Sequence, residues 1–220
     1  MDHVLPREED TDVPAFCRAL GVPGLADIHV HFLPPRMLHR VWQYFDEAGP
    51  LVGVSWPIRY KWSDAERVAH LRSMGVRMFS ALAYAHRPDM AAGLNAWTMA
   101  FGQATAGCLP SATFYPEPAA ARYVREALDA GARIFKVHLQ VGGFAPDDPL
   151  LDVPLARDLG LSGKILLGSD FPNIPYPYAR QIGGLARLGL GDDWLRAVCW
   201  DNPVALFGAP PGSGEAAGGG

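Results

Sequence analysis

The chain has 220 residues, of which 49% are hydrophobic and 19% charged, and it carries a formal net charge of −4. This composition allows a sizeable buried core and argues against bulk disorder. The mild acidity argues against the basic surface typical of nucleic-acid-binding proteins, and nothing in the charge balance points to binding at an anionic membrane surface.

Cysteine usage and the N-terminal sequence favour a cytoplasmic location. Cys17, Cys108 and Cys199 lie far apart and form no CxxC pair, so we expect reduced thiols rather than disulfides or a thiolate metal site. Residues 1–13 lack the basic and apolar regions of a signal peptide, and no apolar run approaches the roughly 18 residues of a membrane span. We therefore predict a soluble cytoplasmic protein without membrane or nucleic-acid partners.

Predicted strands alternate with predicted helices along the chain. The apolar run at 25–32 is bounded by VPG and PP, as expected of a strand. Ser63 followed by Glu66 has the spacing of a capping box at a helix start. In chain order, the predicted strands are 25–32, 76–85, 108–114, 132–140 and 164–171, and the predicted helices are 37–48, 63–75, 90–106, 119–131, 150–159, 176–188 and 192–206.

Three regions follow from this pattern. Residues 1–24 are predicted to form an N-terminal extension, residues 25–208 a single domain, and residues 209–220, which are rich in Gly and Pro, a disordered tail. The Gly- and Pro-punctuated segment at 49–62 is predicted to be a loop with a short strand at 51–54.

The alternation of strands and helices predicts an α/β fold with parallel strands covered by helices. Five or six strands can be counted, whereas a closed barrel of the TIM type has eight strands and about 250 residues. Only 23 residues separate Gln140 from Lys164, which leaves room for one crossover helix. We predict an incomplete (β/α) TIM-type barrel, whose uncovered sheet edge would favour a homodimer.

Asp27, His29 and His31 alternate along the first predicted strand. Residues two apart project to the same face of a strand, so the two imidazoles can bind one metal ion from the same side. Two half-exposed histidines at a strand end are the alternative interpretation. The position at the end of an apolar strand favours metal ligation.

Asp170 follows the apolar run of the last predicted strand, within the sequence GSDFP. A carboxylate in this place lies at the mouth of the sheet, where folds of this kind have their active sites. It can bind a metal ion and accept a proton from a metal-activated water. An aspartate that only caps a helix or forms a turn is the alternative.

Polar residues also alternate at Lys136, His138 and Gln140, which indicates either a polar cavity within the sheet or a solvent-facing stripe on an edge strand. His138 is a candidate catalytic group, additional ligand or substrate contact, and Lys136 is a candidate substrate contact. The aromatic loop at 56–62 contains Arg59, which is suited to a substrate carboxylate, although packing and solubility explain such loops as well.

Several of these segments together resemble the amidohydrolase-related family that includes aminocarboxymuconate-semialdehyde decarboxylase. The resemblance covers about residues 25–208, and its most specific part is HxH near the start followed by GSDFP near the end. The segments are DIHVHFLP, ATFYPEP, ARIFKVHLQVGGF, LLGSDFPNIPYPY and WDNPVALFG.

The resemblance implies a (β/α)₈ barrel with one divalent ion, typically zinc, at the C-terminal mouth of the strands. By position, His29 and His31 correspond to the metal ligands of the first strand. Asp170 corresponds to the aspartate of the eighth strand, which helps to bind the metal and activates water. Members of the family hydrolyse C–N or C–O bonds or decarboxylate small carboxylic acids.

The chain departs from the family pattern after His138, beyond which it contains no histidine. The family has further histidines after the fourth strand, one a metal ligand and one an acid/base or substrate group. Here the stretch at 144–172 joins the segment after the fourth strand directly to the eighth, so the resemblance implies that units five to seven are missing.

Two functions of different classes follow. The first is a metal-dependent hydrolase that acts on a small amide, lactone or carboxylic acid with one divalent ion, expected to be zinc. A carboxy-lyase of the same family is its close variant. The second is a catalytically inactive remnant that serves as a binding or structural module, because part of the barrel is missing.

Overall fold

The computed structural model describes residues 9–47, 56–143, 166–187 and 191–210. The predicted strand at 51–54, the predicted helix at 150–159 and nearly all of the predicted tail lie outside these residues. The chain divides into two compact units, one of residues 1–30, 39–79 and 164–220, and one of residues 31–38 and 80–163. Each unit is described by itself.

Two parallel strands form the centre of the first unit. β1 (Leu25–Asp27) pairs with β2 (Val76–Ser80), with Ala26 opposite Met78. All three residues of β1 are buried, as expected of a parallel strand covered on both faces. The predicted parallel arrangement is confirmed here, although both strands are shorter than predicted.

The first and the last predicted strands, at 25–32 and 164–171, lie side by side in this unit where the structure describes them. The backbone N–H of Ile28 donates to the carbonyl of Leu167 (3.0 Å), and the N–H of Asp170 donates to the carbonyl of His29 (2.8 Å). Val30 and Phe171 form a parallel bridge. The part of the predicted strand 164–171 that the structure describes therefore runs parallel to the residues after β1, without forming a regular strand.

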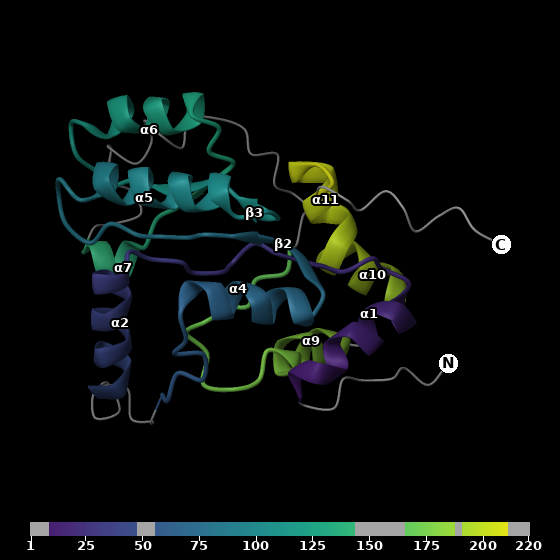
Figure 1. The fold of residues 1–220 in the computed structure, drawn as a ribbon. Coiled ribbons are helices and arrows are strands. Elements are labelled where there is room, and N and C mark those ends of the chain that lie inside the picture. Colours follow the sequence, from purple (N-terminus) through teal and green to yellow (C-terminus); the bar gives the residue numbers. More distant parts are fainter. Residues whose placement is uncertain (1–8, 48–55, 144–165, 188–190, 211–220) are drawn as a thin grey trace. The chain divides into compact units, whose positions relative to one another are not determined.

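Helices make up most of the remaining described residues of this unit, and α1 lies next to α10 (Figure 1). The capping box predicted at Ser63 and Glu66 is present at the start of α4. The predicted helix at 192–206 is also confirmed, as three consecutive helical segments. The helices of this part of the chain are α1 (Val13–Leu20), α2 (Pro35–Glu47, which begins in the second unit), α4 (Asp64–Ser73), α9 (Ala179–Ala186), α10 (Asp192–Arg196), the π-helical η2 (Ala197–Asp201) and α11 (Asn202–Phe207).

No helix was predicted before residue 25, yet the structure contains η1 (Asp10–Asp12) followed by α1. The buried residues of α1 are Val13, Phe16, Cys17 and Leu20. Their spacing of three, one and three is that of a helix with one apolar face. This periodicity was available in the sequence. Among the described helices, none combines the length and the apolarity that crossing a membrane requires.

The second unit contains a second parallel pair, in which β4 (Ser111–Thr113) lies beside β5 (Ile134–Lys136). The predicted strand at 108–114 is divided at Pro110, which has no N–H for a ladder. The other elements of this unit are α5 (Ala91–Ala104), β3 (Cys108–Leu109), α6 (Ala120–Asp129) and α7 (Leu139–Gly142).

Asp10 is a buried carboxylate in η1 that joins three other segments of the first unit. Its Oδ2 accepts hydrogen bonds from the Tyr60 hydroxyl (2.7 Å) and from Nε2 of His70 (2.8 Å), and its Oδ1 accepts one from the N–H of Ala179 (3.3 Å). Burial acts to raise the pKa of Asp10, but these hydrogen bonds outweigh it and hold the pKa below its ordinary value. The ionised carboxylate therefore stabilises this unit.

We expect Asp10→Asn to lower the free energy of unfolding by about 2 kcal/mol at neutral pH, because it weakens hydrogen bonds to a buried charged group. Since the folded-state pKa lies below the unfolded value of about 3.9, the contribution of Asp10 is full above that value and is lost as the pH falls through the folded-state pKa. Urea unfolding of both proteins between about pH 7 and pH 2.5 should show the difference shrinking at the acid end. Asp12→Asn is the matched control, because the Asp12 side chain caps no helix; an equal loss there would contradict the prediction.

Candidate metal centre

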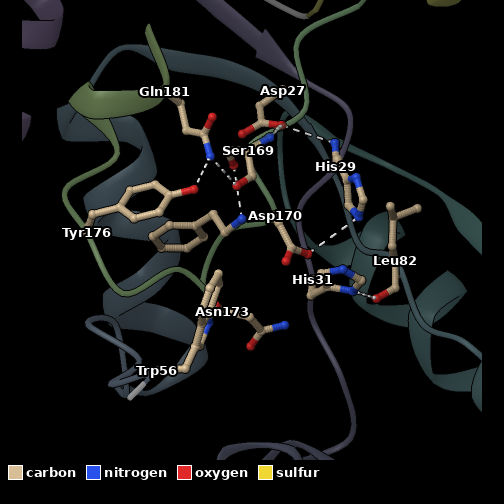
Figure 2. Close-up of polar contacts among 11 residues, drawn as sticks. Asp27, His29, His31, Trp56, Leu82, Ser169, Asp170, Asn173, Tyr176 and Gln181 are labelled. Carbon is tan, nitrogen blue, oxygen red and sulfur yellow. Dashed lines mark hydrogen bonds and ion pairs between the residues drawn. The ribbon is translucent and has the colours of Figure 1, made fainter. Parts of the chain in front are cut away.

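A buried carboxylate at the end of β1 ties together three segments of the first unit. Asp27 has no exposed surface. Its Oδ1 accepts hydrogen bonds from the backbone N–H groups of His29 (3.1 Å) and Ser169 (3.1 Å), and its Oδ2 accepts one from the Tyr178 hydroxyl (2.8 Å). Figure 2 shows Asp27 between the segments that carry His29 and Ser169. Tyr178 is the residue that precedes α9.

The expectation that Asp27 faces the same way as the two histidines is wrong. β1 ends at Asp27, so the alternation of a strand does not continue to His29 and His31. The backbone N–H groups and the Tyr178 hydroxyl use the Asp27 carboxylate instead. Burial raises the pKa of Asp27, and these hydrogen bonds only partly oppose the rise.

His29 and Asp170 lie at the distance of two ligands that share one ion. Nε2 of His29 is 3.5 Å from Oδ1 of Asp170. This distance is long for a charge-assisted hydrogen bond. It agrees with the roughly 3.4 Å between two ligand atoms of a tetrahedral ion whose metal–ligand distances are about 2.1 Å. The two side chains are 40% and 47% exposed, so a small molecule can approach them.

The local structure explains why a glycine stands at position 168 and how the chain turns at Asp170. A Cβ atom on Gly168 would lie 2.8 Å from the Cβ of His29, so a glycine is needed where the two segments approach each other. Asp170 has a φ of 64°, a conformation that is unfavourable for residues with a Cβ and that is often found at functional sites. The same conformation prevents a regular strand from continuing through Asp170.

His31 is buried, and its Nδ1 lies 2.9 Å from the carbonyl oxygen of Leu82. Because a carbonyl only accepts hydrogen bonds, this contact places a proton on Nδ1, so the ring would bind a metal ion through Nε2. His29, His31 and Asp170 each offer one ligand atom, and these atoms all lie within 4.8 Å of one another. These three predicted ligands are therefore a group that could hold a metal ion (Figure 2).

Side chains of β4 hold the segment that contacts His31. Oγ of Ser111 accepts a hydrogen bond from the N–H of Ala81 (3.2 Å). Oγ1 of Thr113 accepts one from the N–H of Ala85 (3.3 Å). Residues 81–85 were predicted to belong to a strand. The serine and threonine hydroxyls replace a backbone ladder there, and the carbonyl within this segment remains available to His31.

In the second unit, the ring of Tyr84 contacts both His138 and His31. Its ring centroid is 5.3 Å from that of Tyr84, and Tyr84 meets His31 edge-on at 5.8 Å. Nδ1 of His138 also accepts a hydrogen bond from the N–H of Val141 (3.3 Å). His138 is not part of the three-residue group that converges in the described chain. Sequence reasoning did not single out Tyr84, which has no motif of its own.

The predicted strand at 132–140 is too long. β5 ends at Lys136, and α7 begins at Leu139. Lys136, His138 and Gln140 therefore do not share one face of a strand, because strand alternation applies only within the strand. Lys136 lies at the end of β5, where its carbonyl accepts a hydrogen bond from the Thr113 hydroxyl (2.7 Å).

The loop that contains Arg59 lies along the residues that follow Asp170. Nε1 of Trp56 donates to the carbonyl of Asn173 (2.9 Å), and the N–H of Arg59 donates to the carbonyl of Ile174 (3.1 Å). The Arg59 guanidinium forms an exposed ion pair with Glu9 at 3.7 Å. The backbone of this loop thus borders the candidate centre.

Fold and site together define an α/β protein with parallel strands and a His-His-Asp group that can hold a metal ion. Residues 153–209 match the family model described as Amidohydrolase. Comparisons with curated proteins and with solved structures give no match. The partial match confirms the resemblance to the amidohydrolase family over the part of the chain that contains Asp170, while His29 and His31 lie outside the matched residues.

We expect Tyr178→Phe to lower the free energy of unfolding by about 2 kcal/mol, because the lost hydroxyl donates to the buried Asp27 carboxylate and such hydrogen bonds contribute about 1.5–3 kcal/mol. Urea unfolding measures the change. Tyr44→Phe, at a side chain that is 57% exposed, is the matched control and should change stability by less than about 0.5 kcal/mol. Equal stability of the two variants would show that Asp27 does not depend on the hydroxyl.

Proposed function

We propose that this chain is a metal-dependent hydrolase of the amidohydrolase type, which uses activated water on a small amide, lactone or carboxylic acid. One observation carries the proposal: His29, His31 and Asp170 offer ligand atoms within 4.8 Å of one another. The match of residues 153–209 to the amidohydrolase family model supports it.

The donor set fits a single divalent ion of the zinc type. Two imidazoles and one carboxylate form a ligand set that zinc takes in catalytic sites, with a fourth position left for water or substrate. The separation of 3.5 Å between His29 and Asp170 agrees with one edge of such a site. The contact between His31 and the Leu82 carbonyl gives the orienting partner that metal-binding histidines usually have.

A divalent ion held by these residues would supply Lewis-acid activation of water and of the substrate carbonyl. His29 and His31 would hold the ion through neutral ring nitrogens, and the proton on Nδ1 of His31 would orient that ring for binding through Nε2. The Asp170 carboxylate has two oxygens, so one can bind the ion while the other accepts the proton of the attacking water. Asp170 then returns this proton to the leaving nitrogen or oxygen.

The remaining predicted site residues take supporting roles in this proposal. His138 is an acid/base or substrate-contacting group, near enough to His31 to share Tyr84 as a neighbour. Lys136 and Arg59 are substrate contacts, each suited to a carboxylate group. A substrate held through its carboxylate would also suit decarboxylation, which is the variant activity of the same family.

A catalytically inactive binding or structural module is the alternative from a different class. A module of this kind needs no metal ion, whereas the hydrolase and the decarboxylase both do. Metal content therefore separates the two classes before any substrate is known, and turnover of small amides, lactones and carboxylic acids then separates the two reactions.

We expect the purified protein to bind close to one equivalent of zinc, measured by inductively coupled plasma mass spectrometry after dialysis. His29→Ala should weaken binding by about 100-fold or more, since even the loss of a group that only orients a ligand costs about 10–100-fold. His39→Ala, at an exposed position of α2, is the matched control and should retain the metal. Absence of metal from the wild type would overturn the proposed function.

We expect Gly168→Ala to weaken metal binding as well, because its Cβ would meet the Cβ of His29 at 2.8 Å and displace the imidazole. Gly93→Ala in α5 is the control, since nothing lies within 4 Å of the added Cβ and alanine favours a helix. Zinc affinity by competition with a chromophoric chelator measures both variants. Unchanged affinity in Gly168→Ala would contradict the proposed position of His29 in the site.

A further inference from the structure

Asp170 keeps an unfavourable backbone conformation, and hydrogen bonds hold the peptide group on each side of it. A residue with a side chain adopts a φ of 64° only where the surroundings enforce it. In the preceding peptide group, the N–H of Asp170 donates to the carbonyl of His29 (2.8 Å), and the carbonyl of Ser169 accepts from Nε2 of Gln181 (3.4 Å). This peptide group is therefore anchored to the segment after β1 and to α9.

The peptide group that follows Asp170 is held from within its own turn. Its carbonyl, that of Asp170, accepts a hydrogen bond from the N–H of Asn173 (2.9 Å). Its N–H, that of Phe171, donates to Oγ of Ser169 (3.0 Å), so the serine side chain reaches across Asp170. Because a peptide group is planar, the two flanking groups together fix φ and ψ of the residue between them. The Ser169 hydroxyl is thus one of the groups that decide the conformation of Asp170.

The Ser169 hydroxyl lies where water cannot replace it. Ser169 is 1% exposed and Phe171 is fully buried, so loss of the hydroxyl would take the acceptor away from a buried N–H, which is costly. A hydroxyl that accepts one hydrogen bond can still donate its proton, and hydrogen bonding from the Ser169 side chain lowers the pKa of Asp27. Ser169 therefore connects the buried Asp27 carboxylate to the turn around Asp170 (Figure 2).

We propose that Ser169 is a positioning residue of the candidate centre, whose hydroxyl holds Asp170 in the left-handed conformation that sets its carboxylate 3.5 Å from Nε2 of His29. The inference rests on the proposed function, because it gives Ser169 a part in binding the ion. Without the hydroxyl, the N–H of Phe171 would turn toward another acceptor and Asp170 would relax toward a negative φ. Its carboxylate would then leave the position beside His29.

The variant Ser169→Ala removes the hydroxyl alone and tests this role. We expect the affinity for zinc, measured by competition with a chromophoric chelator, to fall about tenfold or more, as is usual when a group that orients a ligand is lost. The visible absorption of the Co²⁺-loaded variant should also differ from that of the wild type, because it depends on the number and the arrangement of the ligands. Ser169→Thr keeps a hydroxyl and should bind zinc as the wild type does.

Tyr123→Phe is the matched control for a loss of stability without a role in the centre. The Tyr123 hydroxyl is also buried, accepts from a backbone N–H, that of Tyr115 (3.1 Å), and donates to a buried carboxylate, that of Glu117 (2.9 Å). We expect this variant to lower the melting temperature about as much as Ser169→Ala does, since both remove hydrogen bonds of the same kind, and to keep the zinc affinity of the wild type.

The outcomes separate this inference from the proposed function. Failure of the wild type to bind zinc would overturn the proposed function and this inference with it. Unchanged affinity in Ser169→Ala, or an equal loss in Tyr123→Phe, would overturn the role of Ser169 alone. If Ser169→Ala does not fold, Ser169→Thr decides: wild-type affinity and absorption support the role of the hydroxyl, and a loss of affinity in that folded variant would overturn it.

Discussion

The candidate centre depends on the buried carboxylate of Asp27 more than on any other single group. It accepts hydrogen bonds from the Tyr178 hydroxyl and from the backbone N–H groups of His29 and Ser169, and Ser169 is 142 positions away from Asp27 along the chain. A carboxylate without exposed surface is costly unless such donors surround it. Movement of the Ser169 segment away from β1 would take one donor from this buried group, and the cost of that loss holds together the segments that carry His29 and Asp170.

This constraint explains the geometry of His29 and Asp170. The backbone bonds between residues 28–30 and 167–171 set the two segments in parallel, Gly168 lets them approach, and the left-handed conformation of Asp170 interrupts the strand. The unfavourable φ of Asp170 is maintained by the surrounding hydrogen bonds, as at many functional sites. A site fixed in this way would need little rearrangement to bind a metal ion.

The first unit also depends on a second buried carboxylate, Asp10, which reaches the same region from the N-terminal side. Tyr60 donates its hydroxyl proton to Asp10 and accepts the N–H of Tyr178, whose own hydroxyl donates to Asp27. The two carboxylates are therefore linked through two tyrosines. Residues that precede β1 thus support the centre, and the amphipathic spacing of α1 was the signal in the sequence that could have predicted an ordered element there.

The sequence by itself determined the chemical identity of the site: two histidines at a spacing of two after one apolar segment, and an aspartate after another. It also determined the α/β alternation, because hydrophobic periodicity and capping residues act within a few positions of the chain. Only the tertiary structure decided where strands end and that the Asp27 carboxylate accepts hydrogen bonds from backbone N–H groups. It also decided that Oδ1 of Asn173 is buried without a donor among the described residues. These features depend on which distant segments meet, and a local pattern contains no information about the donors that a distant segment brings.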